Sequence, residues 1–171
     1  MTIIIADTKK GVFTLKLKII EKSAIIGLIL ALLFSFISFY ITCGHIRDNV
    51  VRLHILANSN SAYDQQLKLK VRNRILKESE TLLCGFDTKE QALSEIKNRT
   101  ADLQVAALDE LRKNGCDYDV CVSIEPSYFE TRTYENVTLP AGNYTALKIK
   151  IGKSEGKNWW CVMFPQMCVP T

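Results

Sequence analysis

Apolar and polar residues divide the chain into a short front segment and a longer remainder. The run from Ala24 to Cys43 contains twenty residues without a charge. A helix of that length rises about 1.5 Å per residue and can cross a hydrocarbon core of about 30 Å. A buried core helix is the alternative, but no other part of the chain is apolar enough to surround it. We therefore predict one N-terminal transmembrane or signal helix, through which the chain contacts the membrane.

The charges that flank this run indicate its orientation. Lys16, Lys18 and Lys22 precede it, whereas Arg47 and Asp48 follow it and cancel. The positive-inside rule places the N-terminus in the cytoplasm and the remainder of the chain outside. We expect an extracytoplasmic protein, either secreted or membrane-anchored.

The sequence leaves open whether the apolar run is kept or removed. It is longer than the roughly 7–15 apolar residues of a secretory signal, which favours an uncleaved anchor. Thr42 and Gly44 are nevertheless small enough for cleavage after Gly44. Cys43 adds a lipoprotein as a third alternative, although Tyr40 and Thr42 suit a lipid-attachment box poorly. We predict a basic cytoplasmic segment (residues 1–23), a transmembrane anchor or signal peptide (residues 24–43) and an exported domain (residues 45–171).

Beyond the apolar run, the spacing of apolar residues changes from strand period to helix period and back. Alternation in Val50–Ala57 predicts a strand. Spacing of three to four residues predicts a helix from Ser61 to about Glu80 and a long second helix from Asp87 to about Asn114. Alternation then predicts strands at Tyr118–Ile124, Thr131–Leu139, Tyr144–Ile151 and Trp159–Phe164. This order indicates an α+β fold: a mainly antiparallel sheet with two helices packed on it, preceded by the N-terminal helix.

Short polar residues mark where the two helices begin and end. Ser61 and Asp64 resemble a capping box, and Thr88 and Gln91 have the same spacing at the second helix. Gly115 can adopt a left-handed conformation without a Cβ clash, which predicts the end of the second helix.

The net charge argues against nucleic acid as a partner. The chain carries +4, of which residues 1–44 contribute +3 through five lysines and two acidic residues. The exported domain is therefore nearly neutral, at +1. A nucleic-acid-binding protein needs a basic face to displace counterions from phosphate.

Five cysteines lie in the exported domain, where oxidising conditions favour pairing. Cys161 and Cys168 flank a proline-containing turn and are the first disulfide candidates. Cys116 and Cys121 are a second pair, although an extended strand would hold them apart. Cys84 is then left over. The alternative is that the cysteines remain buried thiols.

Metal and catalytic patterns are weak. The only histidines are His45 and His54, and neither has a second ligand at zinc spacing, so we predict no metal and no cofactor. His54, Ser59 and Asp64 include the residue types of a nucleophilic hydrolase, but no strained elbow accompanies them. The alternative interpretation is a strand histidine followed by two helix-capping residues. We therefore do not expect an enzyme.

Trp159 and Trp160 are the most unusual local feature. In a strand, one ring faces the core and the other faces solvent or a partner. Exposed aromatic rings often anchor interfaces because they bury a large area at low entropic cost. Packing beneath the loop of residues 152–157 is one alternative, and a carbohydrate or cell-wall platform is another.

Two stretches of the exported domain resemble a known family. They are the opening, Arg52–Ser61 with Asp64–Arg72, and the end, Leu139–Leu147 with Gly156–Cys168, which contains NWWCVMFPQMC. Both are similar to the stage II sporulation protein R family. Members of that family commonly carry an acidic residue at the position of Asn60.

The resemblance implies a specific role. Such proteins are made in the forespore of endospore-forming bacteria and exported into the space between the forespore and mother-cell membranes. There they activate a membrane-embedded aspartic protease, stage II sporulation protein GA, which processes the precursor of sigma factor E. This implies a signalling protein and not an enzyme.

We expect two partner-binding patches, and the sequence does not say whether they form one surface. The first patch comprises Arg52, His54, Asn58, Ser59 and Asp64, and the second comprises Asn158, Trp159 and Trp160. They form one surface only if the first and last strands are neighbours. The alternative functions are a cell-wall-associated binding module or a wall hydrolase.

Overall fold

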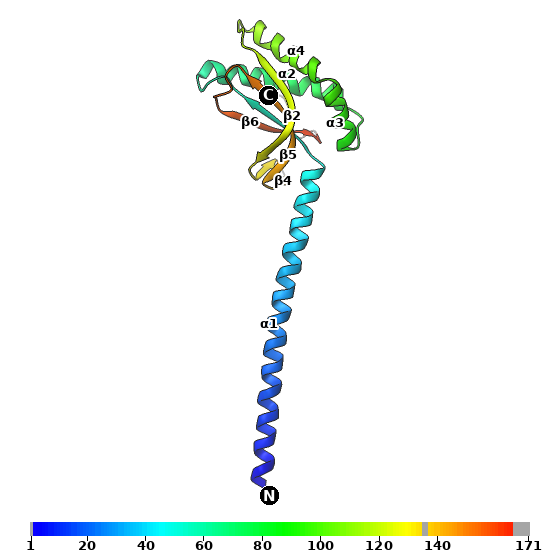
Figure 1. The fold of residues 1–171 in the computed structure, drawn as a ribbon, viewed down its shortest axis with the longest axis vertical. Helices are drawn as coiled ribbons and strands as arrows, with labels where there is room; N and C mark the ends of the chain where they lie inside the picture. Colours follow the sequence, from blue (N-terminus) through cyan, green and yellow to red (C-terminus); the bar gives the residue numbers. More distant parts are fainter. Residues whose placement is uncertain (1, 135–136, 166–171) are drawn as a thin grey trace. The chain divides into compact units, whose positions relative to one another are not determined.

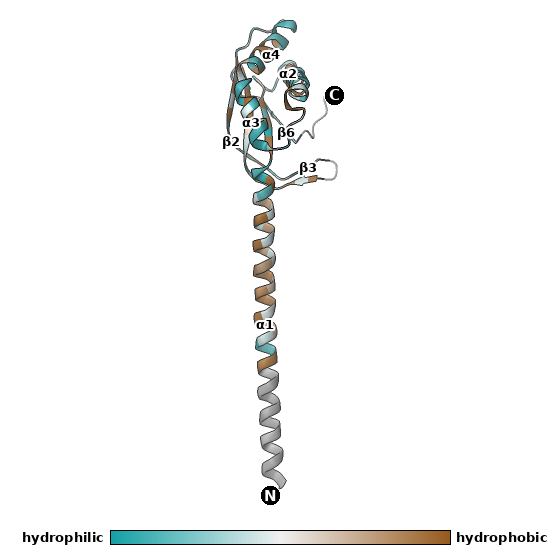
Figure 2. Ribbon diagram, turned by 90° about the vertical axis from the view of Figure 1, so that its right-hand side faces the viewer, coloured by the Kyte–Doolittle hydropathy of each residue, from teal (hydrophilic) through white to brown (hydrophobic). Residues whose placement is uncertain are grey.

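The computed structural model describes residues 2–134 and 137–165, with side chains described from Ile19 onward. The chain divides into two compact units, Met1–Gly44 and His45–Thr171. Helix α1 (Thr2–Asp48) contains the apolar run. Its segment Ile19–Asp48 is long enough and apolar enough to cross a membrane (Figure 2). The large apolar side chains from Ile19 to Ile41 are exposed.

A mixed four-stranded sheet organises the second unit (Figure 1). Its order is β2 (Val120–Phe129), β5 (Gly142–Ile151), β1 (Val51–Leu56) and β6 (Asn158–Phe164). Strand β1 is central: it pairs antiparallel with β6 and parallel with β5, and β2 pairs antiparallel with β5. The parallel pair needs a long crossover, which the three helices and β2 provide. The predicted α+β class is confirmed.

A small hairpin stands apart from this sheet. Strands β3 (Arg132–Tyr134) and β4 (Val137–Leu139) pair only with each other among the described residues. The prediction of one strand over Thr131–Leu139 was therefore wrong, because the segment folds back on itself.

The helices follow the predicted capping with one difference. Helix α2 (Ala62–Leu83) begins where the Ser61 hydroxyl accepts the Asp64 N–H at 3.1 Å, as predicted. The long second helix is divided into α3 (Lys89–Asn98) and α4 (Thr100–Lys113). At the division, the Thr100 hydroxyl donates to the Ile96 carbonyl at 2.9 Å. Such bonding to the preceding turn favours a bend in a helix.

The other two predicted signals are confirmed. The Thr88 hydroxyl accepts the Gln91 N–H at 3.4 Å at the start of α3. Gly115, just after α4, has a φ of 69°, the left-handed region that glycine adopts without strain.

We call the sheet face that carries α2, α3 and α4 the inner face. Its core is aliphatic and almost fully buried, with Leu53 and Ile55 of β1 packed among side chains of α2 and α4 such as Ile75 and Leu111. Full burial of one such side chain contributes about 1.5–3 kcal/mol.

We call the opposite sheet face the outer face. Its buried cluster combines residues of the sheet and of the hairpin, together with the end of α1. Leu139 and Tyr134 of the hairpin pack there with Phe129, Tyr144 and Val162. The hairpin therefore covers part of the outer face and leaves the ends of β1 and β5 near Leu56 and Lys150 outside this cluster.

Candidate partner-binding surface

The two predicted patches lie on neighbouring strands. Strand β1 pairs directly with β6, and His54 lies opposite Trp160 while Leu56 lies opposite Asn158. The first and last strands of the domain therefore bring both sets of residues together. Their role in binding a partner stays a prediction.

Arg52 is fully buried beneath the hairpin. Its Nε donates to the Cys161 carbonyl at 3.0 Å, and one terminal nitrogen donates to the Tyr134 hydroxyl at 2.9 Å. Its guanidinium carbon lies 4.3 Å from the centre of the Phe129 ring and 5.1 Å from that of Tyr144. Burial lowers the pKa of this guanidinium. Arg52 thus ties the hairpin to the sheet and can influence a partner only through that support.

His54 is also buried, with 9% of its surface exposed. Its ring makes edge-to-face contacts with Phe129 and Trp160, each with ring centres 6.0 Å apart. Burial lowers the pKa of the imidazole, which favours its neutral form. No hydrogen bond joins it to Ser59 or Asp64 within the described ranges. These three residues are therefore not assembled for nucleophilic catalysis.

Asp64 organises the turn between β1 and α2. Its carboxylate accepts the Ser59 hydroxyl at 2.6 Å and the Asn58 amide at 2.9 Å. Burial raises the pKa of this carboxyl, but these hydrogen bonds outweigh burial and hold the pKa below its usual value. An ionised Asp64 therefore fixes the shape of the turn.

The same turn holds the loop of residues 152–157, a contact that the sequence did not reveal. The Asn58 side-chain oxygen accepts the Lys153 N–H at 3.0 Å, and that of Asn60 accepts the Lys157 N–H at 2.8 Å. A Cβ at Gly156 would collide with the Ser59 carbonyl, so only glycine allows this close approach. An acidic residue at position 60 could accept the same N–H, but the neutral Asn60 side chain already does so, and a carboxylate is therefore not needed for this contact.

The two tryptophans lie on opposite faces of the sheet, and both are half-buried. Trp159 packs against the inner core beneath the Arg72 guanidinium, whose carbon lies 4.2 Å from the ring centre. Trp160 packs against the outer cluster with Arg132 at 5.5 Å. Asn158 is exposed at the start of β6. Asn158 and the open edge of Trp160 are thus the parts of the second patch that a partner can reach on the outer face.

The state of three cysteines tests part of the disulfide prediction. Cys116 and Cys121 are free thiols, so their proposed pairing was wrong: Cys116 is buried in the inner core and Cys121 is exposed on β2. Cys84 is a free, exposed thiol. Pairing of Cys161 with Cys168 stays a prediction because Cys168 lies outside the described residues.

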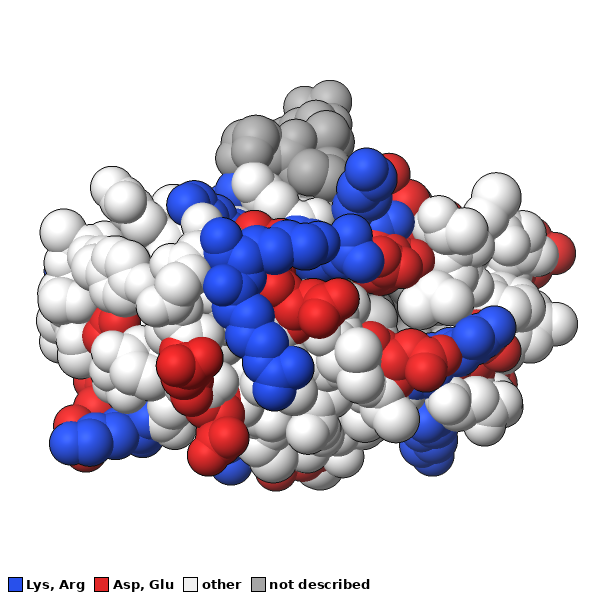
Figure 3. Space-filling view, turned by 90° about the horizontal axis from the view of Figure 1, so that it is seen from above, with Lys and Arg blue, Asp and Glu red and all other residues white. Residues whose placement is uncertain are grey.

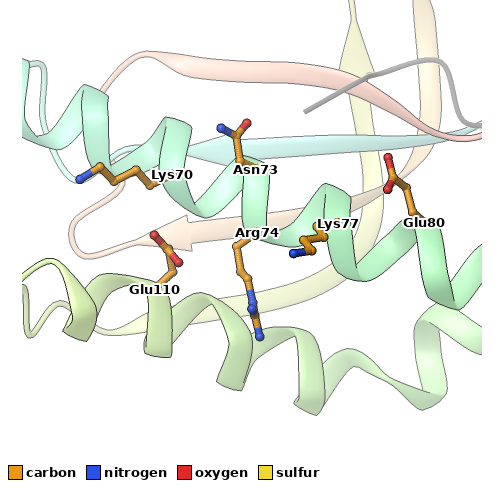
Figure 4. A pocket seen from close by; sticks show the side chains of 6 residues that line it. All are labelled: Lys70, Asn73, Arg74, Lys77, Glu80 and Glu110. Carbon is orange, nitrogen blue, oxygen red and sulfur yellow. The ribbon is translucent and has the colours of Figure 1, made fainter. Parts of the chain in front are cut away.

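Two surface cavities of about 480 Å³ have different linings. The first, between α2 and α4, is lined by side chains of both signs of charge (Figure 4), and its basic residues Lys70 and Arg74 have partners in the domain. Lys70 donates to Asn114, and Arg74 pairs with Glu78 at 2.9 Å. Figure 3 likewise shows acidic and basic side chains intermingled on the face that it displays.

The second cavity lies at the uncovered end of the outer face. It is lined by Leu56, Asp119, Val120, Cys121, Lys148, Lys150, Gly152, Lys153 and Ser154. Across all the described residues, no group of three His, Cys, Asp or Glu side chains could hold a metal ion.

The structure thus defines the class of the protein: an α+β domain that follows a helix of membrane-spanning length and carries a lysine-lined cavity on the sheet face away from its three helices. Comparison with known proteins gives the family. The model of the stage II sporulation protein R family matches residues 47–171. The chain belongs to this family, which implies a role in sporulation and confirms the resemblance noted in the sequence.

One relative illustrates the extent of the similarity. Stage II sporulation protein R of Bacillus subtilis (strain 168) is 37% identical over 123 residues, which is 72% of this chain and 55% of the relative. The chain therefore spans about half the length of the curated relative that it matches. No solved structure matches this chain.

Proposed function

We propose that the domain is an exported signal that activates a membrane-embedded aspartic protease of the stage II sporulation protein GA type. The protease then processes the precursor of sigma factor E in the mother cell. The observation that carries this proposal is the family match over residues 47–171, which includes both β1 and β6. The membrane-length segment of α1 supports export into the space between the forespore and mother-cell membranes.

Activation of this kind requires a difference in affinity between two states of the protease. A ligand shifts an equilibrium only by binding one state more tightly than the other. Moving a population from 1:99 to 99:1 needs a preference of about 10⁴-fold, or about 5.5 kcal/mol. A few well-packed contacts can supply such an energy, since truncating one of the few hot-spot residues of an interface costs about 2 kcal/mol or more.

Within the two predicted patches, we distinguish residues that contact the partner directly from residues that hold the surface in place. Asn158 and Trp160 are accessible and serve as direct contacts. The buried residues Arg52, His54 and Asp64 keep β1, the hairpin and the adjoining turn in place. This division predicts that changes at the accessible positions impair activation without unfolding the domain.

Co-expression in cells that do not sporulate tests the proposal. The full chain, the protease and the sigma-factor precursor are produced together, and cleaved sigma factor is measured by immunoblot. We expect cleavage only when all three proteins are present and the domain is exported. Absence of cleavage with all three proteins produced and the domain outside the cytoplasm would contradict the proposal.

A matched pair of variants tests the contact residues in the same cells. Tryptophan is enriched among interface hot spots, whose truncation costs about 2 kcal/mol or more of binding, so Trp160→Ala should lower cleavage severalfold. Val105→Ala, at an exposed apolar position on α4, is the control and should leave cleavage unchanged. Equal cleavage by both variants, at equal protein levels, would remove Trp160 from the contact surface.

A further inference from the structure

The uncovered end of the outer face is a distinct surface with its own chemistry. Leu56 of β1, Lys150 of β5 and Cys121 of β2 lie side by side in register across three strands. Paired residues in adjacent strands point to the same face of a sheet. Together with Lys148 and Lys153 they line the cavity of about 480 Å³ described above. We call this set of five residues the lysine pocket.

The charge of the lysine pocket is positive although the domain is nearly neutral. Its three lysines face one acidic lining residue, Asp119. Lys148 pairs with Glu125 at 2.7 Å, and that hydrogen bond lowers the pKa of the Glu125 carboxyl. Lys150 and Lys153 make no ion pair within the described ranges. Two ammonium groups therefore remain available for an acidic ligand.

The lysine pocket also has less polar lining residues. Half-buried Leu56 lies on one side of Lys150, and exposed Cys121 lies on the other. A lining that combines these side chains with ammonium groups suits a segment that carries an apolar side chain flanked by carboxylates. Such charge complementarity speeds encounter and fixes the orientation of the partner.

We propose that the lysine pocket binds an acidic segment of a partner protein. This inference rests on the proposed function, since it takes that partner to be the extracytoplasmic part of the protease. The segment inserts an apolar side chain above Leu56 and Cys121, and its carboxylates pair with Lys150 and Lys153. The contact adds to the one made by Asn158 and Trp160 on β6.

Cys121 provides a built-in reporter for occupancy of the lysine pocket. The full chain in detergent is treated with iodoacetamide, and alkylation of Cys121 and of Cys84 is followed by peptide mass spectrometry. The probe is a synthetic peptide of alternating glutamate and leucine, and a lysine–leucine peptide is the control. Cys84 is also a free, exposed thiol but lies in the loop after α2, outside the lysine pocket.

We expect the acidic peptide to slow alkylation of Cys121 severalfold and to leave Cys84 unchanged. The protection should weaken at high salt, where the Debye length falls to about 3 Å at 1 M. The double variant Lys150→Glu/Lys153→Glu should weaken protection about tenfold or more, because like charges then face each other. The control Lys97→Glu/Lys113→Glu makes the same charge change at exposed positions on α3 and α4 and should retain protection.

Three results would overturn the lysine pocket as a binding site. They are no protection of Cys121, equal protection of both thiols, and equal protection in the two double variants. Each variant is compared with and without peptide, so a change in the reactivity of the thiol itself does not affect the outcome.

The co-expression assay separates this inference from the proposed function. If the unaltered chain produces cleavage and Lys150→Glu/Lys153→Glu produces as much as its control, the lysine pocket is excluded and the signalling role stands. If the acidic peptide protects Cys121 but the unaltered chain produces no cleavage, the binding site stands and the proposed partner is wrong.

Discussion

The two faces of the sheet are both closed to solvent at Arg52 and Leu53 of β1, but they are closed by different means. Leu53 on the inner face and Arg52 on the outer face are adjacent in the chain, and both are fully buried. Leu53 is held by aliphatic side chains of the helices and sheet. Arg52 is held by two hydrogen bonds and by the aromatic rings beneath the hairpin. Burial alone therefore does not tell which interactions stabilise a strand.

The largest expected effect lies on the inner face. Leu53→Ala should lower the free energy of unfolding by about 2–5 kcal/mol, because it removes transfer energy and leaves a cavity. Urea denaturation measured by circular dichroism checks this value. A loss below about 1 kcal/mol would lie under the whole expected range. It would show that the inner core collapses around the gap and leaves little cavity.

The corresponding change on the outer face should be smaller and local. Arg52→Met keeps apolar volume but leaves the Cys161 carbonyl and the Tyr134 hydroxyl without this donor, at about 1–3 kcal/mol. Amide hydrogen exchange should increase in β3 and β4 more than in α2. Tyr134→Phe is the comparison: it keeps the guanidinium but removes its bond to the Tyr134 hydroxyl, together with the bond from that hydroxyl to the Trp160 carbonyl at 3.4 Å. Uniform acceleration across the domain would contradict the view that Arg52 acts through the hairpin.

Sequence patterns identified the inner face better than the outer face. The signals for the inner face come from residues close together in the sequence, whereas the contacts on the outer face join residues far apart. The alternation around Leu53 and Ile55 and the caps at Ser61 and Thr88 depend on neighbours within a few residues, and the structure confirms them. The contact between Arg52 and Tyr134 joins residues 82 apart in sequence. No local period encodes a hairpin that returns to cover a strand.

The turn after β1 and the loop of residues 152–157 also depend on contacts between residues far apart in the sequence. Asn58 was assigned to a binding patch because it is polar and follows a strand, but it also holds Lys153, a residue 95 positions away. One signal for the covered outer face was present in Val50–Ala57, where apolar residues outnumber polar ones on both sides of Arg52. Strands buried on both faces have such near-continuous apolar runs.

The pH dependence of stability should distinguish the faces further. Burial lowers the pKa of His54 in the folded state, so the unfolded state binds a proton first as the pH falls. His54 therefore contributes stability that is present above the unfolded pKa of about 6.5 and is lost as the pH falls below it. Denaturation midpoints at pH 7.5 and pH 5.5 should differ less in His54→Phe than in the unaltered chain. An equal difference in both proteins would exclude His54 as the source.

The smallest effect should come from the exposed rim of the outer face. Arg132 on β3 lies over the Trp160 ring at 5.5 Å, and exposed cation–π contacts contribute about 0.5–1 kcal/mol. Arg132→Gln should therefore destabilise the domain by less than Arg52→Met, although both residues place a guanidinium near aromatic rings of the same cluster.

Urea denaturation of the two single variants and of the double variant measures the coupling between Arg52 and Arg132. Because both contacts hold the hairpin against β1 and β6, the double variant should lose less than the sum of the single losses. Strict additivity would mean that Arg132 and Arg52 support the hairpin independently of each other.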